Sequence, residues 1–334
     1  MPELTDGRGP LSRANRGRWL QLSLTPGSGF LMPFVALILV WIVTAAIAGR
    51  GAGGTLTAAI EVGTFSLLAG VGQMFVITGG NGGIDLSVPN VISLSAYVSA
   101  TVASGSNGML VPSLAAGIGV GIVAAIASVI LIELARIPPI IATLAVGFML
   151  NSVVLEFAGS SNATALPSPG LGSFVSADVG PIPVFGIVGV GLTVLAALVL
   201  RRTRFGRAVE AVGQSGGAAR FAGIHVTRTR ALTYLISGIC AGLAGVLLCA
   251  YAGGPTANIG DPYELGSIAV VVLGGCLVTG GRSNAPGIWA AGVLMSLVVT
   301  LVEVAHLAAG FQDIVEGLII VAVLAGPTRS LTSK

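Results

Sequence analysis

Few side chains in this sequence could do chemistry, and most of them lie inside or beside long apolar runs. The candidates for a translocation pathway are Gln73, Asn81, Asp85, Thr143 and Asn151. Polar groups in such positions either line a route for a polar solute or bond a neighbouring helix. The residue types leave both alternatives open, and helix packing is favoured for Gln73, Thr143 and Asn151 taken singly.

The sequence lacks the patterns of a hydrolytic or redox centre. Its one lysine, Lys334, belongs to no Gly-Lys-Ser/Thr sequence, so the phosphate-binding loop of an ATPase is absent. The histidines, His225 and His306, have no zinc-type spacing, and the three cysteines form no CxxC pair. We expect no catalytic residue, no cofactor and no metal in this chain, and we expect the cysteines to be small packing residues.

A basic stretch, TRFGRAVEAVGQSGGAARFAGIHVTRTR, covers Thr203–Arg230. Its pattern predicts a short helix, a break at Ser215–Gly217 and a second short helical piece. Neither piece is long enough to cross a bilayer. Small residues and flanking arginines suit the docking of another protein, while the positive-inside rule alone would also produce a plain basic loop here.

The amino-acid composition indicates which kind of fold positions these residues. The chain is 54% hydrophobic and 9% charged, whereas soluble domains carry about 25% charged residues. The apolar runs are continuous rather than alternating, so they predict helices and not membrane strands. We expect an all-α membrane protein with about ten transmembrane helices, near residues 31–49, 56–78, 84–104, 109–132, 137–158, 182–200, 231–251, 262–279, 285–305 and 311–326.

Glycine is abundant in these runs, with 50 residues in the chain. Two pairs are spaced four residues apart, Gly117 with Gly121 and Gly238 with Gly242. This spacing places small residues on one helix face and predicts close helix–helix contacts.

Arginines set the expected orientation. With the N-terminus in the cytoplasm and ten spans, 15 of the 16 basic residues are cytoplasmic, as the positive-inside rule requires. We therefore expect a disordered cytoplasmic tail at 1–30, a membrane domain at 31–326 with the basic loop 201–230 inside, and a cytoplasmic tail at 327–334.

Two segments suggest internal symmetry. Residues 79–97 and 254–272 both run from Gly/Asn-rich sequence through an aspartate and a proline into a small, apolar helix. In the first, Asp85 or Ser87 would cap the helix. In the second, Asp261 would be the cap, with Glu264 completing a capping box. Five spans per half would make the two halves inverted, as in many transporters.

The basic stretch resembles the cytoplasmic coupling loop of ribose-type sugar permeases from binding-protein-dependent ABC importers, a family shared with branched-chain amino acid permeases. The segments GGIDLSV (82–88) and LGSIAVVVLGG (265–275) are also typical of that family. Within the loop, the resemblance rests on Thr203, Gly206, Arg207, Ala211, Gly213, Ala218, Ala219, Arg220, Gly223 and Ile224. Pro89 and the run Gln214–Gly217 depart from the usual pattern.

The resemblance implies a type II ABC importer fold in the bacterial inner membrane. It implies a separate ATPase with two fused nucleotide-binding domains, which binds ATP and magnesium, a periplasmic sugar-binding protein and a second permease subunit, identical or paralogous. Gly213, Ala218, Ala219 and Gly223 would offer the ATPase a close-approach face. Arg207 would be a charged anchor, and Glu210 its i,i+3 partner or a contact of its own.

The alternative function is a secondary transporter coupled to protons or sodium. Such a carrier needs ionisable groups deep in the membrane, and Glu61 and Glu303 are the acidic residues nearest the interiors of predicted spans. A carrier of this kind has no partner ATPase and no need for a docking loop. No nucleic-acid partner is expected.

Overall fold

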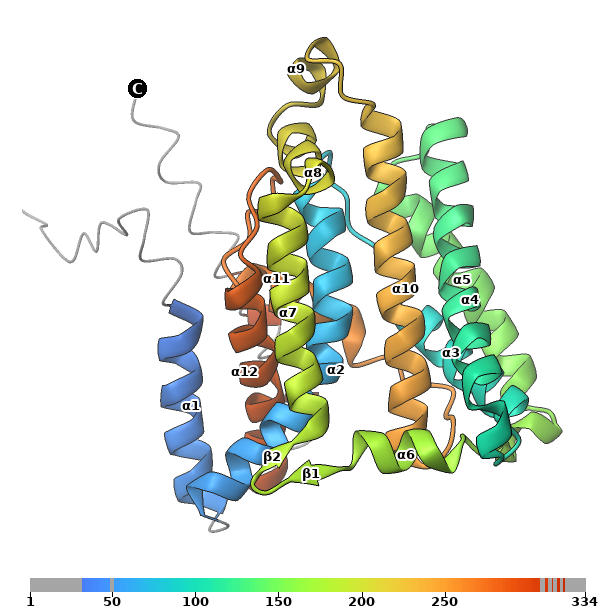
Figure 1. Cartoon of the computed structure of the whole chain (residues 1–334), viewed down its shortest axis with the longest axis vertical. Coiled ribbons are helices and arrows are strands. Elements are labelled where there is room, and N and C mark those ends of the chain that lie inside the picture. Colours follow the sequence, from blue (N-terminus) through green and yellow to red (C-terminus); the bar gives the residue numbers. More distant parts are fainter. Residues whose placement is uncertain are drawn as a thin grey trace, which may run out of the picture.

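The computed structural model describes residues 32–48, 51–306 and six further residues between 310 and 321. Helices dominate this part of the chain (Figure 1). In chain order the elements are α1 (Met32–Ala48), α2 (Ala52–Thr78), α3 (Val88–Ala103), η2 (Asn107–Met109), α4 (Leu110–Val129), the π-helical turn η3 (Ile130–Leu134), α5 (Pro139–Ala158), η4 (Ser161–Thr164), α6 (Pro169–Val175), β1 (Asp178–Val179), β2 (Ile182–Pro183), α7 (Val184–Arg202), α8 (Arg204–Gln214), α9 (Gly216–Phe221), α10 (Val226–Ala252), α11 (Tyr263–Leu273) and α12 (Ala285–Val304).

Six helical segments among the described residues are long and apolar enough to cross a membrane. They are α2, the continuous run from η2 through η3, α5, α7, α10 and α12. Three shorter apolar helices, α1, α3 and α11, match further predicted spans. The chain is therefore a multi-pass helical membrane protein. The tenth predicted span and both predicted tails lie outside the continuously described residues.

The α3 and α11 helices begin later than the sequence suggested. Ser87 precedes α3 without a side-chain capping bond. The prediction that Asp261 caps the second helix is wrong, because α11 begins at Tyr263 with Pro262 before it. Asp261 belongs instead to a preceding turn, in which the Glu264 amide donates to the Asp261 carbonyl at 3.1 Å.

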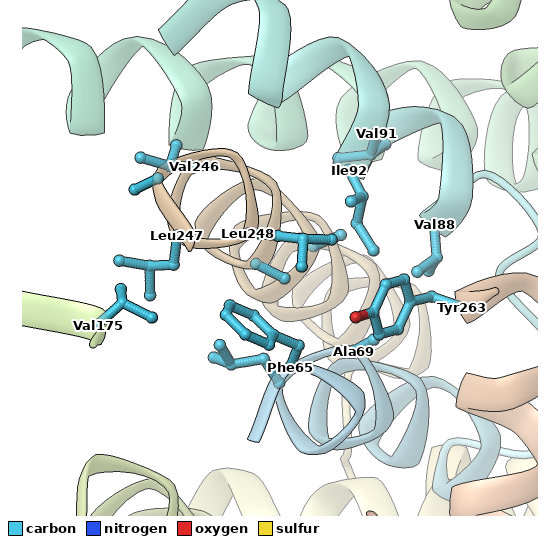
Figure 2. Close-up of a cluster of buried hydrophobic side chains, with 14 of the residues drawn as sticks. Phe65, Ala69, Val88, Val91, Ile92, Val175, Val246, Leu247, Leu248 and Tyr263 are labelled. Carbon is cyan, nitrogen blue, oxygen red and sulfur yellow. The ribbon is translucent and has the colours of Figure 1, made fainter. Parts of the chain in front are cut away.

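The α2 and α10 helices form the centre of the bundle. Side chains from these two helices and from α3, α6 and α11 point toward one another in one apolar cluster (Figure 2). Phe65 of α2 is fully buried there and contacts Phe185 at the start of α7, with ring centroids 4.7 Å apart. Burial of this kind fixes the two central helices against each other.

The predicted glycine contacts are confirmed, and the two pairs turn out to be partners. Gly121 of α4 lies against the backbone of Gly238 of α10, and Gly242 lies against the backbone of Gly117. A methyl group at any of these four positions would meet a neighbouring atom. All three cysteines are also buried and unpaired, as expected.

The connection at residues 159–181 contains structure that the all-α prediction missed. The helix α6 is followed by a short antiparallel hairpin in which Asp178 pairs with Pro183 and Val179 with Ile182. Gly180 makes the turn with φ of 64°, a conformation that glycine adopts without steric cost. The hairpin and α6 lie at the opposite end of the bundle from α8 and α9 (Figure 1).

Candidate functional site

The basic stretch folds as two short helices whose ends are fixed by hydroxyl caps. Thr203 Oγ1 accepts a hydrogen bond from the Gly206 amide at 3.0 Å and begins α8. Ser215 Oγ accepts from the Ala218 amide at 3.2 Å and begins α9. A side-chain acceptor at this position satisfies amides that have no partner within the helix. The predicted break therefore lies at Ser215.

The C-terminal end of α8 packs against the permease chain itself. Gly213 leaves no space for a side chain, because the Thr78 carbonyl at the end of α2 and the backbone of Gly281 lie against it. The Gly281 amide donates to the Thr78 carbonyl at 2.9 Å, and Gln214 Nε2 donates to the Gly281 carbonyl at 3.2 Å. We call this contact of α8, the end of α2 and the α11–α12 loop the glycine junction.

Glu210 strengthens the same junction. Its Oε1 accepts a hydrogen bond from Ser283 Oγ at 2.9 Å. Arg207 is exposed, and its Nη1 donates to the Arg202 carbonyl at 3.3 Å. Among the described residues the two side chains form no ion pair, so Glu210 has a contact of its own.

The faces of α9 differ sharply in exposure. Ala219 is buried against Val212 of α8 and Val226 of α10, with Ala211 and Ile224 at the edge of the cluster. Ala218, Arg220 and Gly223 are exposed. Two of the four residues predicted to meet an ATPase, Gly213 and Ala219, thus contact their own chain. The other two, Ala218 and Gly223, remain open.

Phe221, at the end of α9, is the residue that the sequence prediction missed. Its side chain is 96% exposed. Residues two apart on a helix point in different directions, so burial of Ala219 turns Phe221 outward. An aromatic residue in a stretch of small and charged residues was the available signal. Aromatic residues are enriched among the residues that carry most of the binding energy at protein interfaces, so Phe221 is a candidate contact for a partner.

Three of the five candidate pathway residues belong to a buried hydrogen-bond network, and Asn81 and Asn151 lie outside it. Gln73 Oε1 accepts a hydrogen bond from the Asp85 amide at 3.3 Å, and Asp85 Oδ1 accepts one from Ser87 Oγ at 2.6 Å. Asp85 Oδ2 accepts one from Ser237 Oγ of α10 at 2.7 Å. Thr143 of α5 joins the same loop, since its hydroxyl accepts from the Leu86 amide at 3.1 Å.

These bonds hold the unwound segment between α2 and α3 against α5 and α10. Gln73 and Thr143 are completely buried, and Asp85 is nearly so. Asn81 lies apart from the network, exposed at the end of α2 with φ of 60°. Asn151 is half-buried two turns beyond Thr143 and makes no contact with the network in the described structure.

The two segments paired by the symmetry argument meet in space. Gly260, just before α11, lies directly on the backbone of Pro89 in α3. The Gly260 amide donates to Ser93 Oγ at 3.1 Å. A non-helical segment thus precedes each of the helices α3 and α11, and the segment before α11 packs against α3.

The described helices form a multi-pass membrane bundle with two short helices, α8 and α9, at one end. The family described as "Branched-chain amino acid transport system / permease component" matches residues 55–324. This chain belongs to that family, whose members are transport components.

Relatives with related names cover most of the chain. The galactofuranose transporter permease protein YtfT of Escherichia coli (strain K12) is 32% identical over 276 residues, which are 78% of this chain and 80% of that protein. The ribose import permease RbsC of Bacillus subtilis (strain 168) is 32% identical, covering 79% and 81%. The autoinducer 2 import system permease LsrC of Enterobacter sp. (strain 638) is 30% identical, covering 72% and 70%. No solved structure matches this chain significantly.

Proposed function

We propose that this chain forms the translocation pathway of an ABC importer for a monosaccharide or a related small polar metabolite. The substrate class follows from the relatives, which are named for galactofuranose, ribose and autoinducer 2. The alternative of a secondary transporter is not favoured, because these relatives are subunits of import systems. Glu303, one of its two candidate groups, is exposed at the end of α12.

The observation that carries the proposal is the exposed end of α9. Phe221 projects from a helix whose opposite face is anchored in the permease through Ala219. A rigidly held, exposed aromatic residue suits insertion into a pocket of a partner ATPase. That ATPase, with two fused nucleotide-binding domains, would bind ATP and magnesium, since the sequence has no phosphate-binding loop.

The glycine junction would pass movement of α8 to the membrane helices. Gly213 and Glu210 contact the end of α2 and the α11–α12 loop directly. Closely packed backbones move together because the interior is nearly incompressible. A displacement of α8 by the ATPase would therefore shift the segments next to α3 and α11.

The remaining parts of the assembly follow the family pattern. We infer a type II importer fold with ten helices in two inverted halves, both termini in the cytoplasm, a second permease subunit and a periplasmic binding protein in a bacterial inner membrane. The contact between Gly260 and Pro89 supports pairing of the two halves. The positions of Arg136, Arg220 and Arg230 around one cavity support a single cytoplasmic end.

Reconstitution tests this function. The permease, its ATPase and its binding protein in proteoliposomes should take up substrate when ATP is supplied, and uptake should survive collapse of the proton gradient. A thermal-shift screen of the binding protein against pentoses, hexoses and sugar alcohols would select the solute. Uptake by the permease alone, driven by a pH gradient, would contradict the proposal.

A further inference from the structure

A polar cavity lies behind α9, separate from the exposed tip that carries Phe221. Its volume is about 400 Å³, within the range of small-ligand sites. Its walls come from the end of α2, the corner between η3 and α5, α9 and the first turns of α10. The charged lining residues are Glu133, Arg136, Arg220 and Arg230.

The charge of this cavity is strongly positive for so small a space. Arginines from three separate segments line it, and Glu133 is the one acidic residue in the lining. Among the described residues, no ion pair joins Glu133 to any of the three arginines. The N-terminal turn of α10, which contributes Thr227 and Arg230, adds the positive end of a 27-residue helix.

The Arg230 side chain has a hydrogen-bond donor without an acceptor in the described part of the chain. Its Nε atom is buried and has no hydrogen-bond partner within the described structure. A buried donor without an acceptor is unfavourable, and guanidinium groups pair best with planar or tetrahedral oxyanions. Arg230 thus has an unused donor beside the cavity that it lines.

We propose that this cavity binds a small phosphate-bearing anion on the side of the permease that carries α8 and α9. A phosphate group has enough acceptor oxygens to bond three guanidinium groups at once, whereas a single carboxylate offers two. The cavity is lined by four segments of this chain and is partly open to solvent, while the surface suited to a protein partner is the protruding tip at Phe221. A small molecule fits this placement better than an acidic side chain of the ATPase.

Binding there would have a mechanical consequence, which rests on the proposed function. Arg220 belongs to α9, and Arg136 belongs to the corner that precedes α5. An anion held between them would link the segment that receives the ATPase to a membrane helix. The occupied site would restrain α9 relative to α5.

The test uses the full-length permease and inorganic phosphate as the probe. Calorimetric titration and thermal unfolding would be compared in phosphate, acetate and chloride at equal ionic strength. Arg136→Gln and Arg220→Gln alter exposed side chains, so they should fold normally. Each should weaken phosphate binding by about tenfold or more, because each removes a charge-assisted hydrogen bond.

Arg228→Gln is the matched control, because Arg228 is exposed on the same turn of α10 but does not line the cavity. This variant should bind phosphate as the parent does. Equal weakening by Arg228→Gln, or acetate binding as tight as phosphate, would overturn the proposal. Loss of phosphate binding on addition of the ATPase would also overturn it, since the cavity would then be part of the docking surface. None of these measurements requires transport, so a negative result here leaves the importer assignment intact.

Discussion

Gly121 of α4 and Gly238 of α10 lie so close that the carbonyl oxygen of each occupies the space of the other's missing Cβ. One turn away, the Gly117 carbonyl likewise occupies the space of the missing Cβ of Gly242, while Val246 lies against Gly117. Close backbone approach gives helices in lipid the van der Waals contact that replaces a hydrophobic driving force. These two contacts hold α4 against the central helix α10.

Gly121→Ala should therefore destabilise the permease by about 1–3 kcal/mol, the usual effect of overpacking a tight contact. Gly119→Ala is the control, because Gly119 lies on the same helix with open space around it. Thermal unfolding of both variants in detergent gives the comparison. If the two variants unfold at the same temperature, the α4–α10 contact is not as close as described.

The buried carboxylate of Asp85 gives a second prediction. Ser237→Ala removes one of its hydrogen-bond partners, at 2.7 Å, and should lower stability by about 1–3 kcal/mol, the cost of leaving a buried polar group without its partner. Ser128→Ala is the matched control. The Ser128 hydroxyl is buried without a hydrogen-bond partner in the described structure, so its removal should leave stability unchanged or raise it slightly. A larger loss from Ser128→Ala than from Ser237→Ala would count against the network.

Phe221 tests the docking surface. Phe221→Ala should reduce pull-down of the ATPase by at least about tenfold, because exposed aromatic anchors at interfaces are worth about 2 kcal/mol or more. Permease abundance should not change, since the Phe221 side chain is almost fully exposed. Phe174→Ala is the control at the opposite end of the bundle, where the ring is 41% exposed. Equal pull-down by both variants would remove the main support for an ATPase at α9.

A variant at the glycine junction should distinguish binding of the ATPase from transmission of its movement to the membrane helices. Gly213→Ala forces the Thr78 carbonyl or Gly281 to move, so uptake should fall while the ATPase still binds through Phe221. Gly217→Ala changes a glycine with no close neighbour beyond Ser215 and should behave as the parent. Uptake by reconstituted vesicles, measured beside ATPase pull-down, distinguishes the two. Normal uptake by Gly213→Ala would mean that α8 moves independently of α2.

Much of the helical framework was predictable because each span must be continuously apolar. Glycine spacing likewise predicted the close contacts of α4 and α10. The two short pieces and the break between them were also predicted, whereas the capping roles of Thr203 and Ser215 were not, although hydroxyl caps act within one turn of sequence. These features depend on local or lipid-imposed rules that a sequence displays directly.

Features that depend on tertiary contacts could not be predicted in the same way. The close packing of Gly213 follows from the position of Thr78, which is far away in sequence. The small residues of a docking face also look the same as those of an internal contact. Likewise, Ser237 is 152 residues from Asp85, and no local pattern pairs them. The basic cavity arises only when η3, α9 and α10 come together.

The last prediction concerns the orientation of the chain in the membrane. Ala222 is exposed just after α9, and Ser176 is exposed after α6 at the other end of the bundle. With the basic loops in the cytoplasm, Ser176→Cys in intact cells should react with an impermeant thiol reagent, and Ala222→Cys should react only after the membrane is opened. Ser168, in the same connection as Ser176, is completely buried and would not report orientation. The native cysteines are all buried, so the background should be low. Labelling of Ala222→Cys from outside intact cells would reverse the orientation and place α8 and α9 beyond the reach of any cytoplasmic ATPase.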